Sequence, residues 1–407
     1  MTKSLSSITR YSLFTLLIFT PLARGSVQGW AITVIHMVTL IALAAFFLEK
    51  SQTGSWKWIK TPLDKPIICI LFICILSSVF SLHRYSSFWS MVLLINYVVI
   101  FYLIINTVRT RSQFRQLVYL IIGVAAFLSI FGLIKQSGAN PFPWWDYPEI
   151  TQNVNRLSAT FGNANHLAGY MEMAIPLLLG FFLMDIKGIK LFMMICLSFL
   201  LLTTLILSLS RGGWFGALFG LFFMVFALLM NRHIEKKKKV ILISICGFLA
   251  VIFIVLASTP VVERILTFEK MDKLEGREKI YGGIVEMIQD HPILGAGPGT
   301  FATIYTQYQP PGFGRRYFYG HNDYLQLISE TGLPLIAIMV WMIIALYKKG
   351  LNKLKNPSRL VRGVTLGAMS GITAILFHST VDFNLHIPAN AILFTVLAAL
   401  VAAPIPE

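Results

Sequence analysis

Long apolar runs, separated by short polar connections, follow one another along most of this chain. Most runs have roughly 17–22 residues, the length at which an α-helix crosses a hydrocarbon core about 30 Å thick. The alternation of apolar and polar residues that marks the strands of a membrane β-barrel does not occur in the sequence. The pattern therefore predicts an all-α polytopic membrane protein. We expect about twelve membrane-spanning helices, at residues 11–23, 29–48, 66–82, 88–107, 117–135, 167–186, 191–209, 213–230, 240–257, 333–347, 364–380 and 387–403.

Two longer polar segments, 136–166 and 258–332, interrupt this pattern. We treat residues 1–407 as a single membrane domain and 258–332 as a long loop with amphipathic helices between the ninth and tenth spans. Within the loop, Glu278–Asp290 places four apolar residues at helical spacing, which favours a helix lying on the bilayer surface. Arg277 precedes the first turn of this predicted helix, close to the positive end of its dipole.

Charge along the chain fixes its orientation. Of all residues, 56% are hydrophobic and 13% charged, and the mean hydropathy is +0.72. With the N-terminus in the cytoplasm, 22 of the 34 lysines and arginines lie on the cytoplasmic side, as the positive-inside rule requires. Both termini are then cytoplasmic and both long polar segments face the opposite side. The net charge of +16 is thus a topology signal with attraction to anionic membrane lipids, and no nucleic-acid partner is expected.

The sequence contains no pattern typical of a metal site. The four cysteines lie inside apolar runs without the spacing of metal ligands or of a disulfide framework. No D-x-D pair and no H-E-x-x-H motif occurs. We therefore expect no metal ligands, and a metal-dependent transferase acting on nucleotide sugars is disfavoured.

Polar residues mark the start of the sixth predicted span. Asn163 and Asn165 can cap the helix there. Alternatively, Arg156 and the two amides face a polar ligand at the mouth of this helix. Glu172 lies further along the span, and it should face the bundle interior or a water-filled cavity because a carboxylate is costly in lipid.

Arg211 lies in the very short connection between the seventh and eighth spans. It either reaches out to lipid phosphates or, held between two helices, binds a lipid-linked phosphate through its planar guanidinium group.

His321 lies at the N-terminal end of a predicted helix that leads to the tenth span. Its imidazole can accept a proton near neutral pH, and Asp323 is close in sequence. Asn322 and Tyr324 follow as candidate substrate ligands. Asp382, between the last two spans, is a further candidate that pairs with an arginine across the bundle or caps a helix.

Five segments together resemble the O-antigen ligase/polymerase superfamily, which includes WaaL-type ligases and Wzy-type polymerases. They are RLSATFGNANHLAGY (156–170), SLSRGGWFG (208–216), GREKIYGGIVEMIQDHPILGAGPGTF (276–301), HNDYLQLISETG (321–332) and HSTVDFNLHIP (378–388). The resemblance covers roughly residues 150–390, and the first five spans match in hydropathy alone.

This resemblance implies a bundle of the GT-C glycosyltransferase type in the bacterial inner membrane, with a large periplasmic loop over the active site. It implies an undecaprenyl-diphosphate-linked glycan as donor, no cofactor and no metal. Arg211, Arg277 and His321 would be the functional positions. The arginines could neutralise the charge that develops on the leaving diphosphate, while His321 either takes the proton of the acceptor hydroxyl or orients the diphosphate.

Our leading hypothesis is an O-antigen ligase that transfers a glycan to the lipid A-core. The alternative is a polymerase, whose acceptor is another lipid-linked repeat unit. A protein O-oligosaccharyltransferase is a third possibility. A transporter or flippase predicts broken helices and charged residues near mid-bilayer, whereas the ionisable residues here gather at the outer edge.

Overall fold

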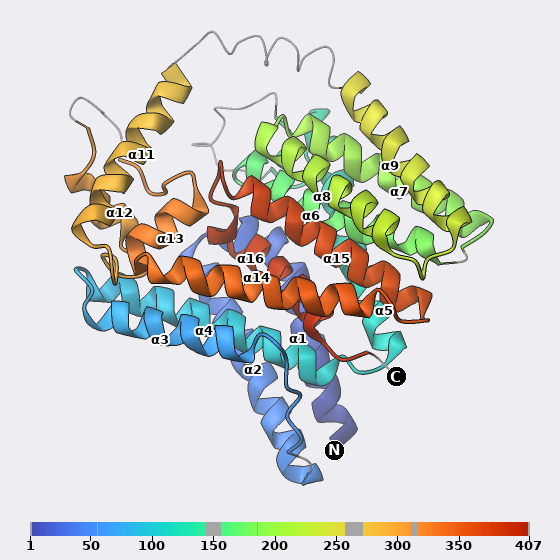
Figure 1. Cartoon of the computed structure of the whole chain (residues 1–407), viewed down its shortest axis with the longest axis horizontal. Coiled ribbons are helices and arrows are strands. Elements are labelled where there is room, and N and C mark those ends of the chain that lie inside the picture. The colour runs from blue at the N-terminus through green and yellow to red at the C-terminus, as the bar shows by residue number, and fades with distance from the viewer. Residues whose placement is uncertain are drawn as a thin grey trace.

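The computed structural model describes residues 2–54, 56–143, 156–184, 186–256, 272–310 and 316–405. This part of the chain is helical and contains no strand, which confirms the all-α prediction. A helix lies at each of the predicted spans: α1 (Thr2–Leu22), α2 (Gly29–Thr53), α3 (Asp64–Val79), α4 (Arg84–Thr107), α5 (Arg111–Gln136), α6 (Ala164–Gly180), α7 (Ile189–Leu207), α8 (Arg211–Met230), α9 (Lys236–Leu256), α14 (Pro334–Lys353), α15 (Arg359–His378) and α16 (Pro388–Ala402) (Figure 1).

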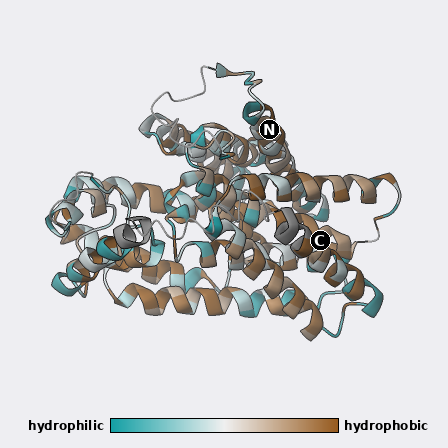
Figure 2. Cartoon of the chain, turned by 90° about the horizontal axis from the view of Figure 1, so that it is seen from above, coloured by the Kyte–Doolittle hydropathy of each residue, from teal (hydrophilic) through white to brown (hydrophobic). Residues whose placement is uncertain are grey.

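Among the described residues, nine helices are long and apolar enough to cross a membrane, as expected for a polytopic membrane protein. The helices α3 and α16 are shorter, with 16 and 15 residues. Apolar residues dominate the long helices, and hydrophilic residues gather mainly at their ends and in the connections (Figure 2). The count of twelve spans and the GT-C arrangement therefore stay predictions.

The helices α6 and α15 form the centre of the bundle. In the most apolar stretch of α6, all residues are buried, and in that of α15, 83% are buried. In the corresponding stretch of α14, at the periphery, only 17% of the residues are buried. Both α6 and α8 pack along α15. These three helices therefore form the protein-facing interior, while the apolar faces of helices such as α14 are left for lipid.

Glycines allow α6 and α15 to approach backbone to backbone. A Cβ atom on Gly180 would lie 2.1 Å from the carbonyl oxygen of Gly363, and one on Gly363 would lie 2.2 Å from that of Gly180. Gly367 and Gly371 continue the same face of α15 at four-residue spacing, against carbonyl groups of α6. Such rows of small residues are typical of close helix packing in membranes, and this one fixes the register of α6 against α15.

The long loop carries α11 (Asp272–Asp290), α12 (Phe301–Ile304) and α13 (Asp323–Thr331), which gather at one end of the molecule (left in Figure 1). Ile280, Ile284 and Met287 of α11 are buried against Phe301 and Tyr305 of the same loop. The predicted amphipathic helix is thus confirmed, but its placement on the bilayer surface was wrong. Its apolar face had a closer partner in the aromatic residues that follow it in sequence.

The start of α11 also corrects one expectation about Arg277. Because α11 begins at Asp272, Arg277 lies in its second turn and does not precede its first. The amides at the positive end of the helix dipole are therefore not beside Arg277, and an anion held there would not meet both.

Serines of the α3–α4 region hold a turn of the loop, Gly295–Gly299, which we call the glycine turn. The Ser77 hydroxyl donates to the carbonyl oxygen of Leu294 at 2.6 Å. Gly297 has a φ of 115°, and a Cβ atom there would lie 2.1 Å from the Ser81 hydroxyl. Only glycine satisfies both the backbone conformation and this close approach, so the glycine turn is the point where the loop attaches to the bundle.

A carboxylate of α13 holds the glycine turn from its other side. Glu330 is buried, and it accepts hydrogen bonds from the backbone N–H of Gly299 at 2.7 Å and of Phe301 at 3.2 Å. Burial raises the pKa of the Glu330 carboxyl despite these donors. The glycine turn, α12 and α13 thereby form one connected unit.

Candidate active site

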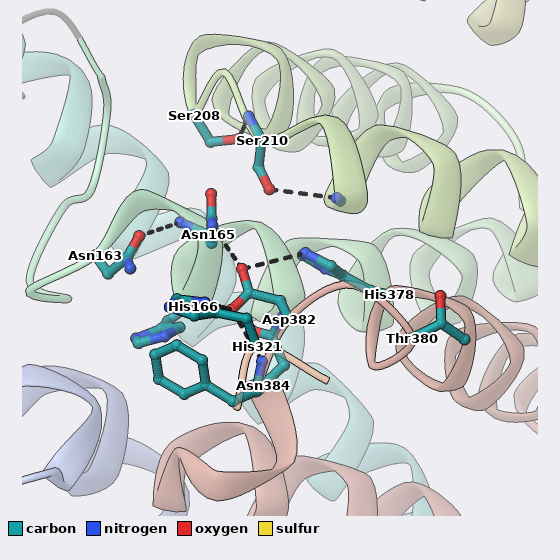
Figure 3. A network of polar contacts seen from close by, with 12 residues as sticks. Asn163, Asn165, His166, Ser208, Ser210, His321, His378, Thr380, Asp382 and Asn384 are labelled. Carbon is teal, nitrogen blue, oxygen red and sulfur yellow. Dashed lines mark hydrogen bonds and ion pairs between the residues drawn. The ribbon is translucent and has the colours of Figure 1, made fainter. Parts of the chain in front are cut away.

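The polar connection between α15 and α16 is the centre of the candidate site. Asp382 is buried there, and its Oδ2 atom accepts a hydrogen bond from Nδ2 of Asn165 at 2.5 Å, at the start of α6 (Figure 3). Its Oδ1 atom accepts from the backbone N–H of Phe383 at 2.9 Å. Nδ1 of His321 lies 3.8 Å from Oδ1, and Nε2 of His378 lies 4.0 Å from Oδ2. One carboxylate thus connects α6, α15 and the long loop.

The two ring nitrogens of His321, Nδ1 and Nε2, lie in different surroundings. Its Nδ1 atom is buried towards Asp382, although 3.8 Å is too long for a direct hydrogen bond. The side chain is 32% exposed, and Nε2 is the ring nitrogen that is not buried against Asp382. The backbone of His321 has a φ of 50°, and its carbonyl oxygen accepts a hydrogen bond from the Tyr281 hydroxyl at 3.0 Å.

Asp323 has a partner that sequence proximity did not suggest. Its Oδ1 atom lies 2.5 Å from Nδ1 of His386, and its Oδ2 atom accepts from the backbone N–H of Leu385 at 3.0 Å. Burial alone would lower the pKa of His386, but the hydrogen bond and the charge of Asp323 outweigh it and raise that pKa. Asp323 therefore fixes the short helix η7 (Asn384–His386), and Asp382, not Asp323, faces His321.

Arg156 joins this network through an amide. Its Nε donates to the carbonyl oxygen of Ser208 at 2.9 Å, and its Nη2 donates to Oδ1 of Asn165. The Asn163 side chain accepts from the backbone N–H of Asn165 at 2.9 Å and caps α6, as expected. Asn165 thus stands between Arg156 and Asp382, where the sequence had suggested a direct pair of Asp382 with an arginine.

Glu172 is buried inside the bundle, as predicted, and lies against a histidine. Oε1 of Glu172 is 3.1 Å from Nδ1 of His378, and both side chains are almost fully shielded from solvent. Gly212 also touches this histidine, since a Cβ atom on Gly212 would lie 2.4 Å from Cδ2 of His378. The first turn of α8, where Arg211 is the first residue, is therefore next to the polar network.

Arg277 can be located only by its place in α11, because its side chain lies outside the described part. It precedes Tyr281 by one helical turn, and residues four apart share a helix face. Since the Tyr281 hydroxyl reaches the His321 carbonyl, this face of α11 runs beside the candidate site.

Asn322 and Tyr324 have structural partners. Asn322 caps α13 through its side-chain oxygen, and its Nδ2 donates to the carbonyl oxygen of Thr380 at 2.9 Å. The Tyr324 hydroxyl donates to the carbonyl oxygen of Leu376 at 2.7 Å. Both residues hold α13 against the end of α15, and their role as substrate ligands stays a prediction.

Arg315 and Arg316 are neighbours in the long loop, and only Arg316 belongs to the described residues. Arg316 donates to the carbonyl oxygen of Ala302 through Nε at 3.0 Å and Nη2 at 2.8 Å, which gives it a role in the loop. Arg315 lies outside the described residues.

The electrostatics of the site favour an ionised Asp382. Burial alone would raise the pKa of its carboxyl, but contact with His321 and the charges of His378 and His166 outweigh this and hold the pKa well below its usual range. In the described part of the chain, no three or more His, Cys, Asp and Glu residues are grouped so that they could hold a metal ion.

Residues 196–340 match a protein-family model described as O-antigen ligase. This segment, which we call the O-antigen ligase domain, is therefore similar to that family. The match confirms the resemblance to the O-antigen ligase/polymerase superfamily, whose members are membrane enzymes of the glycosyltransferase kind. No curated protein matches the chain significantly. Arg211, Arg277 and His321 lie within the O-antigen ligase domain, whereas Asn165 and Asp382 lie outside it.

Sequence reasoning missed the pairing of Glu172 with His378 and of Asp323 with His386. The available signal was the cost of ionisable residues in or beside apolar helices, which implies an internal partner for each. Glu172 and His378 are 206 positions apart. Only the packing of α6 on α15 decides which residues meet.

Proposed function

We propose that this protein is an O-antigen ligase that transfers a glycan from undecaprenyl diphosphate to the lipid A-core, on the periplasmic face of the bacterial inner membrane and without a metal ion. The family match supports the reaction class. The observation that carries the proposal is His321, with Nδ1 turned to the buried Asp382 and Nε2 as the ring nitrogen that is not buried against it.

In this reaction the bond between the anomeric carbon and the diphosphate oxygen breaks, and a bond from the acceptor hydroxyl oxygen to that carbon forms. The hydroxyl proton passes to Nε2 of His321 and then to solvent, while the diphosphate leaves with the bonding electron pair. Asp382 stabilises the imidazolium that forms, in the manner of a carboxylate behind a general base. The 3.8 Å separation can shorten when His321 becomes charged.

Arginine side chains can stabilise the negative charge of the leaving diphosphate. A diphosphate needs little help from a general acid, but its growing charge is stabilised by preorganised cations in a partly desolvated site. Arg211, at the first turn of α8 beside His378, and Arg277, on α11 one turn before Tyr281, are the residues we assign to this role. Arg156, Asn163, Asn165, Asn322, Tyr324 and Asp382 are the assigned substrate-binding or supporting residues.

We expect Arg211→Ala and Arg277→Ala each to reduce glycan transfer by about 100-fold or more, as for other removed charge-stabilising groups. Arg211→Lys should recover only part of the rate, because lysine lacks the planar fork. The measurement is transfer by purified full-length protein in excess EDTA, where the wild type is expected to stay active. Arg359→Ala is the matched control, since Arg359 pairs with Glu235 away from the site. Wild-type rates in both alanine variants would remove the arginines from the mechanism.

A polymerase is the second candidate, because the same geometry accepts another lipid-linked repeat unit as the attacking alcohol. The glycolipids of a deletion strain separate the two. We expect long glycans to accumulate on undecaprenyl diphosphate, because a ligase acts after the chain is built. Accumulation of single repeat units would instead assign the polymerase function, and an unchanged glycolipid profile would contradict both. Re-expression of the wild-type chain should restore the normal profile.

A further inference from the structure

Four ionisable side chains form a continuous row from the interior of α6 to the exposed edge of the site. Glu172 lies 3.1 Å from His378, His378 lies 4.0 Å from Asp382, and Asp382 lies 3.8 Å from His321. The first three are 0%, 1% and 2% exposed, whereas His321 is 32% exposed. Figure 3 shows the outer part of this row, with Asp382 between the two histidines. The mechanism above uses only its outer half.

We propose that Glu172 and His378 are positioning residues that set the proton affinity of His321 through the Asp382 carboxylate that both histidines share. The inference rests on the proposed function, in which His321 takes the acceptor proton. It adds a pair of buried residues behind Asp382 to the determinants of the rate.

The sharing of Asp382 is the physical basis of this proposal. Two imidazoles approach its two oxygens, so a charge on one weakens what the other gains from the same carboxylate. Glu172 competes with Asp382 for His378, because it contacts Nδ1, the other ring nitrogen of His378. The Oε2 atom of Glu172 has no hydrogen-bond partner. When His378 is paired with Glu172, the charge of Asp382 is available to interact with His321.

A count of charges gives the direction. With Asp382 ionised and one proton held by the Glu172–His378 pair, on either residue, the three buried groups carry one net negative charge behind His321. Other charged or titratable groups face His378 and Asp382 from the packed elements and stay unchanged in the variants below. They are His166 from α6 and Asp323 from α13.

Glu172→Gln removes one negative charge and lets His378 form a closed ion pair with Asp382. His321 should then lose its proton at lower pH. His378→Gln removes the positive charge and leaves Asp382 to His321 alone, so His321 should hold its proton to higher pH. The double variant removes one charge of each sign and should return close to the wild type. A general loss of structure does not produce opposite shifts that cancel.

The test measures how readily His321 reacts with diethyl pyrocarbonate as a function of pH, because a histidine reacts with this reagent only in its neutral form. Full-length protein in lipid nanodiscs is labelled, and the modification of His321 is quantified by mass spectrometry. Buried His378 is shielded from the reagent. We expect the pH midpoint of labelling to move by about one unit in each single variant, the order of magnitude for one charge within about 8–10 Å in a partly buried site. The acid side of the pH profile of glycan transfer should move with it.

Two controls define the outcomes. Ser370→Ala changes another buried polar group of α15 away from this row, and it should leave the midpoint unchanged. If Glu172→Gln does not fold, Glu172→Asp withdraws the carboxylate from His378 and should lower the midpoint by less. Unchanged midpoints, or shifts of one sign in both single variants, overturn the proposal. If the two single variants shift the labelling midpoint in opposite directions but the protein transfers no glycan, the coupling between Glu172, His378 and His321 stands and the proposed function is rejected.

Discussion

Replacing His321 by asparagine is expected to slow glycan transfer by a factor of about 10²–10⁴, the usual contribution of a general base. Asparagine is the suitable replacement because His321 has a φ of 50°, a conformation that asparagine adopts more readily than most other residues. The variant therefore removes the imidazole without straining the backbone carbonyl that Tyr281 binds.

The same variant separates the two roles left open for His321. Loss of a base lowers kcat and leaves KM for the lipid-linked donor nearly unchanged, whereas loss of a diphosphate ligand raises KM. Both constants are measured with purified protein and a synthetic donor. His233→Asn is the control, since His233 is exposed at the beginning of the segment that leads to α9. Transfer within about threefold of the wild type, less than an acid–base group contributes, would contradict both roles.

The second large effect is expected from Gly363→Ala, which should prevent stable folding. A single methyl group there would lie 2.2 Å from the carbonyl oxygen of Gly180, and a backbone group cannot move aside as a side chain can. Overpacking a well-filled interior costs about 1–3 kcal/mol or more, and here it separates the two central helices. We expect the thermal unfolding transition of the purified protein to fall by many degrees or to disappear.

Gly123→Ala is the matched control for this experiment. It also lies inside an apolar helix, α5, but a Cβ atom there meets nothing within 4 Å. Alanine is the better helix former by roughly 0.5–1 kcal/mol, so this variant should be as stable as the wild type or slightly more stable. Equal unfolding temperatures for the two variants would show that α6 and α15 do not meet in this way.

The features that could be predicted from the sequence are those set by local pattern. The length of the apolar runs predicted the helices. The cost of placing a carboxylate in lipid predicted the buried position of Glu172. The position of Asn163 as a helix cap followed from the side-chain chemistry of helix starts.

The contacts between distant segments could not be predicted in this way. An apolar stripe such as Ile280, Ile284 and Met287 looks the same whether it covers lipid or protein, because both are apolar. The contacts of Glu172 with His378 and of His321 with Asp382 depend on which helix ends lie next to each other. That information is contained in the glycine contacts between helices and not in the motifs themselves.

The attachment of the glycine turn to the α3–α4 region has a consequence for biosynthesis. Ser77 and Leu294, which hydrogen-bond, are 217 positions apart in the chain. At a synthesis rate of about 5–20 residues per second, the serines of the α3–α4 region wait on the order of 10–40 s for the loop that covers them. His321 and Asp382 are made later still, so the proposed catalytic arrangement cannot exist on the nascent chain. A ribosome-bound protein is therefore inserted into the membrane well before it can act on any glycolipid there.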